Sequence, residues 1–146
     1  MDYVEPQYHQ ILFRLADAGV EFIGVGMVSA ILQGVPLTTM DLDIVHRRSP
    51  ENVERLLRVL ADLEAVARND LISTRFGDFN CHGAIDGGRG YEDLLSSSVS
   101  LEFEGRTFQF LHLREVLAVK KRAGRPKDLA AIPYIESTID EIERNA

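Results

Sequence analysis

The stretch TTMDLDIVH (residues 38–46) places two carboxylates, Asp41 and Asp43, one residue apart inside an apolar run. Acidic residues are depleted in β-strands and costly to bury, so the charge of this pair must be balanced in some way. In a strand, residues two apart lie on the same face. We therefore expect Asp41 and Asp43 to lie side by side, while Leu42 and Ile44 face the core.

Three interpretations of the aspartate pair are open. Two like charges repel unless a cation lies between them, and Mg²⁺ held by both carboxylates, with water and substrate phosphates, would relieve the repulsion. An exposed strand end that tolerates acids would explain the same spacing. So would Arg47 and Arg48, which follow the strand and could neutralise Asp41 or Asp43 without any metal.

The composition is that of a globular protein. Its 146 residues are 45% hydrophobic and 27% charged, which argues against a disordered or fibrous chain. The formal charge of −7 disfavours broad coating of nucleic acid, although a local basic patch can still dock phosphate. A single cysteine, Cys81, excludes an intrachain disulfide and a cysteine-based zinc site. Because Cys81 alternates with Asn80, we expect a buried, unreactive thiol.

We expect a cytoplasmic protein with no membrane partner. The segment MDYVEPQYHQ (residues 1–10) has neither the basic nor the apolar region of a signal peptide. The longest apolar run, FIGVGMVSAILQGVPL (residues 22–37), is interrupted by Gly, Ser, Gln and Pro and is too short to span a bilayer.

Hydrophobic periodicity and turn residues predict a helix–strand–helix–strand–helix order, followed by strands and then by helices. Helices are expected at 7–18, 27–34, 50–63, 91–97 and 113–144, the last one broken near Gly124 and Pro126. Strands are expected at 20–25, 41–46, 70–76 and 78–85, with a hairpin at 99–112. This order predicts an α/β (α+β) fold, a mixed β-sheet flanked by helices. We expect one domain, 1–146, with a core at about 20–111 and C-terminal helices at about 112–144.

Several motifs in fixed order add to this pattern. FIGVGMVSAILQG (residues 22–34) is typical of a strand, a glycine turn and a helix whose first amides can receive a phosphate. The aspartate strand follows, then STRFGDFNCHGAIDGGRGYEDLLSSS (residues 73–98) and FLHLREVLAVKKRAGRPKDLAAI (residues 110–132). Over residues about 20–135 this set resembles the nucleotidyltransferase fold of the polymerase β superfamily. Within it, the chain is most similar to minimal nucleotidyltransferases and abortive-infection toxin-like proteins.

The resemblance implies a site for two Mg²⁺ ions held by three carboxylates, which align a nucleoside triphosphate against an acceptor hydroxyl. Asp41 and Asp43 match the first two carboxylates. The third position, three residues past Gly77, holds Asn80, an amide that brings no negative charge and cannot act as a base. Asp78, two residues earlier and on the same face, would substitute for it in part.

The resemblance also implies a phosphate-binding turn, from which this chain departs. Gly26 matches the first glycine, but Met27 stands where a second Gly or Ser belongs. Ser29 offers a hydroxyl at a position where alanine is usual.

The densest positive cluster of this acidic chain is KKRAGRPK (residues 120–127). It would receive a triphosphate, an RNA or an acidic partner protein, with Lys121 and Lys127 as the phosphate contacts. A solvated helix end whose cations favour the helix dipole is the alternative. Asp128 is expected to be a first-turn helix residue rather than a ligand.

Histidines end two predicted strands, His46 after the aspartates and His82 after Asn80. If those strands pair, both histidines would lie near the acids as metal ligands, and simple exposure is the alternative interpretation. Thr38 and Thr39 are interpreted as turn hydroxyls.

Two hypotheses follow from these residues. In the first, the protein binds a nucleoside triphosphate with Mg²⁺ and transfers a nucleoside monophosphate to a hydroxyl of a protein, a tRNA or a small molecule. In the second, a catalytically impaired member acts as a binding module, for example with a cognate toxin or antitoxin protein. Asp41 and Asp43 favour the first hypothesis, whereas Met27 and Asn80 favour the second.

Overall fold

A computed structural model describes residues 7–39, 41–69 and 71–146. The helices of these residues are α1 (Tyr8–Asp17), α2 (Gly26–Leu32), α3 (Pro50–Asp62), α4 (Tyr91–Leu95), α5 (Leu113–Ala123) and α6 (Pro126–Arg144). The strands are β1 (Phe22–Val25), β2 (Asp41–His46), β3 (Val66–Arg68), β4 (Leu71–Thr74), β5 (Gly77–His82), β6 (Ser98–Phe103) and β7 (Arg106–Leu111). The single-domain prediction includes residues 1–6 and 40, and the predicted strand 70–76 begins at residue 70. Residues 1–6, 40 and 70 lie outside the described residues.

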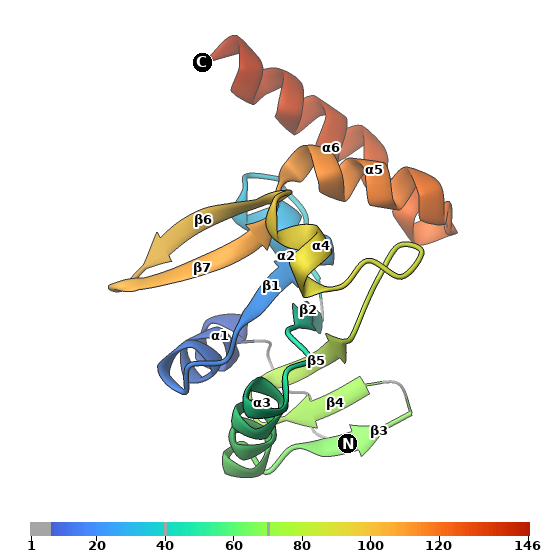
Figure 1. Ribbon diagram of the computed structural model, residues 1–146. Coiled ribbons are helices and arrows are strands. Elements are labelled where there is room, and N and C mark those ends of the chain that lie inside the picture. Colours follow the sequence, from blue (N-terminus) through green and yellow to red (C-terminus); the bar gives the residue numbers. More distant parts are fainter. Residues whose placement is uncertain (1–6, 40, 70) are drawn as a thin grey trace.

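The strands form one mixed sheet, in the order β3-β4-β5-β2-β1-β7-β6 (Figure 1). At its centre, β2 runs parallel to β5 and antiparallel to β1, and β1 runs parallel to β7. The predicted mixed sheet is confirmed. Because β2 is central, its two aspartates lie in the middle of the sheet rather than at an exposed edge.

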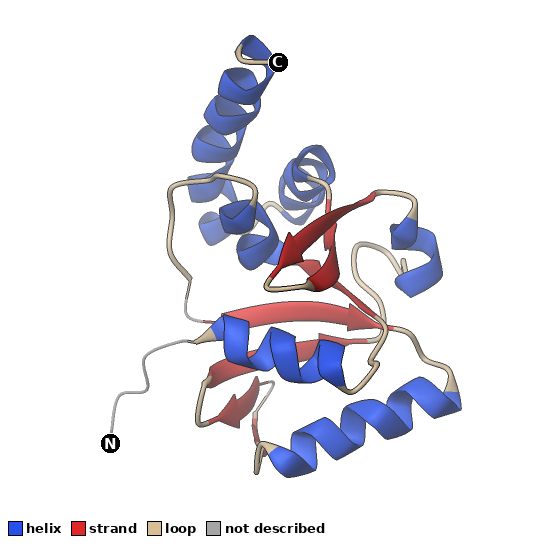
Figure 2. Cartoon of the chain, turned by 90° about the vertical axis from the view of Figure 1, so that its left-hand side faces the viewer, coloured by secondary structure: helices blue, strands red, loops and turns tan. Residues whose placement is uncertain are grey.

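Helices cover both faces of this sheet (Figure 2). The core between one face of the sheet and helices α1 and α3 includes the buried side chains of Ile11, Leu15, Leu42, Ile44, Leu56, Leu63 and Phe79. Beside α4, α5 and α6, those of the other face include Ile23, Val45, Leu94, Leu111, Val116 and Ile135. Leu42 and Ile44 face the core, as predicted, so the aspartates of β2 face the side of α5 and α6.

The turn between α5 and α6 fixes where the basic residues lie. Gly124 has a left-handed backbone (φ 63°), and its amide donates to the carbonyl of Lys120 at 2.9 Å. A glycine at this position lets a backbone amide satisfy a carbonyl of the last turn of α5. Pro126 then begins α6, because its fixed φ suits a first helical position. The two helices therefore fold back on each other, with their junction beside the loop that follows β5 (Figure 1).

Strand β3 was not predicted from the sequence. Its three residues are all exposed and pair with β4 at the sheet edge. An edge strand with no buried face shows no apolar alternation, so its sequence carries no strand signal. None of the helices in the described part of the chain is long and apolar enough to cross a membrane.

Candidate functional site

The site begins with the register between β2 and β5. Asp41 lies opposite Asp78, and Asp43 lies opposite Asn80. Because residues two apart share a face, Asp41, Asp43, Asn80 and His82 all project to the side of α5 and α6. The parallel pairing of these strands therefore brings together Asp41, Asp43 and Asn80, the three residues that the sequence predicted as one site.

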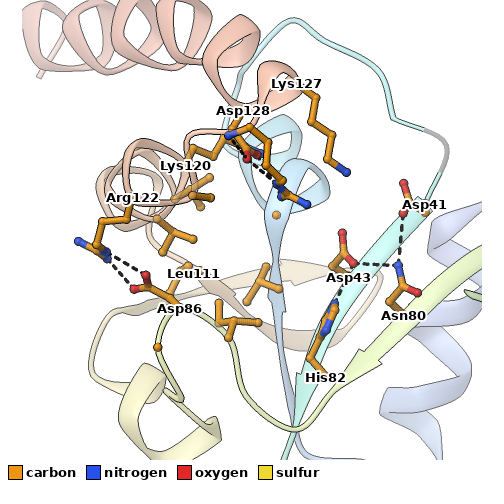
Figure 3. A pocket seen from close by; sticks show the side chains of 18 residues that line it. Asp41, Asp43, Asn80, His82, Asp86, Leu111, Lys120, Arg122, Lys127 and Asp128 are labelled. Atoms are coloured by element: carbon orange, nitrogen blue, oxygen red, sulfur yellow. Dashed lines mark hydrogen bonds and ion pairs between the residues drawn. The ribbon is translucent and has the colours of Figure 1, made fainter. Parts of the chain in front are cut away.

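The amide of Asn80 lies between the two carboxylates (Figure 3). Its Nδ2 donates to Asp43 Oδ1 at 3.1 Å and to Asp41 Oδ2 at 3.3 Å. The other end of the amide, Oδ1, is buried and has no hydrogen-bond partner among the described residues. One neutral side chain thus offers its donors to both acids at once.

Two further residues close around Asp43. His82 Nε2 lies 3.0 Å from Asp43 Oδ1. On the opposite side, the left-handed backbone of Gly26 (φ 65°) passes so close that a Cβ there would lie 3.0 Å from Asp43 Oδ2. Gly26 therefore lets the start of α2 approach the carboxylate, which a larger residue would prevent.

Two clefts meet at the aspartate pair. The first, of about 560 Å³, lies between the sheet, residues 85–87 and the α5–α6 junction (Figure 3). The second, of about 410 Å³, lies on the side of α2 and the segment before β2. Both clefts are lined by Gly26, Asp41, Asp43, Lys120, Arg125 and Lys127. A ligand in either cleft would therefore contact the acids and the cations together.

Asp128 organises two of these cations. Its buried carboxylate accepts from Lys120 Nζ at 3.2 Å, from Arg125 Nε at 2.7 Å and from the backbone amide of Arg125 at 3.2 Å. Burial raises the pKa of Asp128, but the hydrogen bonds and charges of Arg125 and Lys120 outweigh burial and hold it below its usual value. Asp128 is thus a first-turn residue, as expected, and it also positions cleft cations.

Lys127 differs from the other cations of the clefts. Lys120, Arg122 and Arg125 each form an ion pair. Within the described chain, Lys127 alone of the cleft cations has none, and its side chain points toward Asp41 (Figure 3). Its ammonium group is therefore free to meet an anionic ligand.

A charge cluster holds the loop after β5 against α5. Asp86 accepts two hydrogen bonds from Arg122, at 2.9 and 2.7 Å, and one from Arg89 at 3.1 Å. Arg89 also pairs with Glu115 of α5. Hydrogen bonds from Arg122 and Arg89 outweigh burial and lower the pKa of Asp86. The loop thus forms a fixed wall of the first cleft, which the sequence analysis did not identify.

Two predicted phosphate contacts lie away from the clefts. Ser29 is fully buried, where its hydroxyl donates to the carbonyl of Leu111 at 2.6 Å and accepts from Gln33 at 3.1 Å. Lys121 lines neither cleft and pairs with Glu136 of α6 at 3.5 Å. Adjacent helix residues point about 100° apart, so Lys120 enters the cleft and Lys121 does not.

Of the other residues that the sequence placed near the aspartate pair, some contact it and others do not. Arg47 does not neutralise the aspartates, because it pairs with Glu21 at 2.7 Å and with Glu92 at 3.1 Å. Met27 lines the second cleft. The Thr39 hydroxyl donates to Asp41 Oδ1 at 3.4 Å. Cys81, predicted to be buried, is partly buried against the core, and this burial raises the pKa of its thiol to about 12.

The donor set of the site suits a hard divalent cation. Carboxylate oxygens from Asp41 and Asp43 face one point, and the amide of Asn80 already occupies a position between them. Among the described residues, no group of three or more His, Cys, Asp or Glu side chains could hold a metal. An ion at this point would therefore share its coordination with water and ligand oxygens.

Comparisons with solved structures agree on one architecture. A Thermotoga maritima protein classed as a nucleotidyltransferase matches with a TM-score of 0.58 and 18% identity, over 90% of this chain and 93% of that one. ANT(2″)-Ia, in complex with adenylyl-2″-tobramycin, matches with a TM-score of 0.61 and 15% identity, over 93% and 90%. The chain has the nucleotidyltransferase fold.

A third solved structure has the same architecture. An antigenic nucleotidyltransferase-like protein from Paracoccidioides brasiliensis matches with a TM-score of 0.63 and 16% identity, over 90% of this chain and 72% of that one. No protein-family model and no curated protein matches the sequence. The likeness therefore establishes the nucleotidyltransferase fold, and the activity must be inferred from the site.

Proposed function

We propose that this protein binds a nucleoside triphosphate together with Mg²⁺ at the aspartate pair and transfers a nucleoside monophosphate to a hydroxyl acceptor. The observation that supports it most is the arrangement of opposite charges across the clefts. Asp41 and Asp43 face Lys127, which is free of ion pairs within the described chain, while Lys120 and Arg125 stand beside it. A metal–triphosphate needs both kinds of charge within one cleft.

Asp41 and Asp43 are the residues that would hold the metal. When bound, Mg²⁺ neutralises phosphate charge and polarises the phosphoryl group for attack. The remaining work falls to this chain's own side chains. Lys127, Lys120 and Arg125 would bind phosphate oxygens, and Asp128 would keep Lys120 and Arg125 in place before the ligand arrives.

The proposed acceptor is a hydroxyl compound that fits beside Asn80 and His82. The first cleft, of about 560 Å³, lies in the size range of small-molecule sites. ANT(2″)-Ia, which shares the fold, is known in complex with an adenylylated small molecule, adenylyl-2″-tobramycin. A small-molecule acceptor is therefore the first class to test, followed by tRNA and protein.

A second candidate function is favoured by Asn80. A neutral amide cannot remove the proton of an acceptor hydroxyl, so nucleotide binding without transfer is consistent with the same site. The protein would then act as a nucleotide-responsive binding module. Membership of a toxin–antitoxin pair stays a prediction.

Transfer of a labelled nucleotide separates these candidates. Each of the four nucleoside triphosphates, labelled at the α-phosphate, is incubated with Mg²⁺, the protein and a small-molecule, tRNA or protein extract. The first candidate predicts a labelled product that is absent with the D41N/D43N double variant. Nucleotide binding without product from any acceptor pool would support the second candidate and contradict the first.

A further inference from the structure

We propose that Asn80 makes this a one-ion site, in which its side-chain amide lies between the two carboxylates of the free protein and reverses when the single ion binds. This inference rests on the proposed function, because it concerns the metal bound with the nucleotide. It assigns Asn80 a positioning role at the pair, where a third carboxylate would instead bring a charge for a second ion.

The orientation of the amide in the free protein follows from its partners. Ionised carboxylates only accept hydrogen bonds, so the NH₂ end of Asn80 must face Asp41 and Asp43. The two contacts, at 3.3 and 3.1 Å, place its partly positive hydrogens between the two negative groups. The amide thus reduces the repulsion of the pair at the point where a cation would otherwise lie.

The far end of the same amide shows why the orientation can change. Oδ1 of Asn80 is buried and unpartnered among the described residues. When a cation enters between the carboxylates, the amide can reverse and present Oδ1, the atom that coordinates metals, to the ion. One end of the amide lacks a partner in either orientation, so reversal exchanges one unsatisfied group for another.

The number of protein carboxylates at the site then limits the number of ions that the protein can hold. Asp41 and Asp43 together balance one divalent cation, and Asp43 already has His82 at 3.0 Å. The nearest further carboxylate along β5 is that of Asp78, which lies opposite Asp41 rather than Asp43. A second ion would therefore lack a protein carboxylate of its own beside Asp43.

Counting bound ions tests this inference directly. The protein is saturated with the non-hydrolysable analogue α,β-methylene-ATP and titrated with Mn²⁺, whose free form is measured by electron paramagnetic resonance. We expect one ion per wild-type complex, two for Asn80→Asp, and one for Asn80→Leu with about tenfold weaker affinity. Asp140→Asn, a matched change at an exposed carboxylate of α6 that lines neither cleft, should leave one ion with unchanged affinity.

The amide itself gives a second readout, in the side-chain ¹⁵N–¹H spectrum during a Mg²⁺ titration of the analogue complex. Both Nδ2 hydrogen resonances of Asn80 should move as the amide reverses. Those of Asn52, whose Nδ2 donates to the carbonyls of Glu21 and Arg47 at 2.9 and 2.8 Å, should stay in place as an internal control.

The outcomes separate this inference from the proposed function. Two ions in the wild-type complex, or stationary Asn80 resonances with one ion bound, would overturn the role of Asn80 and leave the proposed function intact. Failure of the analogue to bind with Mn²⁺ or Mg²⁺ would overturn the proposed function itself. One ion, with a second gained only by Asn80→Asp, supports the inference.

Discussion

At the residue scale, Asp128 has the largest predicted effect on stability, and its partners Lys120 and Arg125 line the clefts. Removing one partner of a buried ion pair leaves the other charge uncompensated. Asp128 is fully buried, and the side chain of its partner Lys120 is only 11% exposed. We expect Asp128→Ala to lower the free energy of unfolding by about 3–5 kcal/mol in urea denaturation. Asp140→Ala, at an exposed position of the same helix, should change it by less than about 0.5 kcal/mol.

The same variant has a predicted pH dependence. The pKa of Asp128 in the folded protein lies below its usual value of 3.8. The contribution of the ionised Asp128 to the free energy of unfolding is therefore fully present above that pH. It is lost as the pH falls through the folded pKa. The difference in unfolding free energy between wild type and Asp128→Ala should therefore shrink below about pH 3.8, and a difference independent of pH would contradict this assignment.

Single residues also mark the limit of what the sequence could predict about the site. Strand periodicity was sufficient to place Asp41 and Asp43 on one face, because the period of a strand is nearly fixed. Whether Lys120 or Lys121 enters the cleft depends on the rotation of α5 about its axis. Only the packing of the helix decides this rotation, so the sequence pointed to Lys121 as the phosphate contact. The interior position of Ser29 likewise depends on its contact with Leu111, 82 residues away.

At the element scale, the parallel pairing of β1 with β7 depends on the absence of a side chain at Gly24. A Cβ there would lie 2.3 Å from Cδ1 of the buried Phe110 ring, a distance that neither group can relieve without moving. We expect Gly24→Ala to lower the free energy of unfolding by about 1–3 kcal/mol in urea denaturation.

Gly90→Ala is the matched control for this substitution. A Cβ at Gly90 would meet its nearest atom, the carbonyl oxygen of Gly83, at 3.5 Å, which is ordinary contact. Its backbone φ of −94° is open to alanine. Equal losses for Gly24→Ala and Gly90→Ala would show that crowding against Phe110 is not the cause.

The elements themselves were predicted where burial alternates clearly. The strand 41–46 and the hairpin at 99–112 correspond to β2 and to the β6–β7 pair. The loop at 85–87 carried no such pattern. Its position as a cleft wall comes from the pairing of Asp86 with Arg122, which joins residues 36 positions apart.

At the scale of the whole molecule, the site exists only because distant parts of the chain meet. The acids come from β2, while the cations come from α5 and α6, about 80 residues later in the sequence. The protein is acidic overall, with a formal charge of −7, yet basic residues gather where the two parts meet. This local reversal of charge favours a small anionic ligand over a long nucleic acid.

The most direct test of this account is an isothermal titration of ATP in the presence and absence of Mg²⁺. We expect binding that depends on Mg²⁺ in the wild type and is weakened at least about tenfold in the D41N/D43N double variant, since both metal ligands lose their charge. Asp140→Asn, at an exposed position that lines neither cleft, serves as the control and should bind like wild type. Absence of Mg²⁺-dependent binding in the wild type, or unchanged binding in the D41N/D43N variant, would contradict the claim that the aspartate pair holds a metal-bound nucleotide.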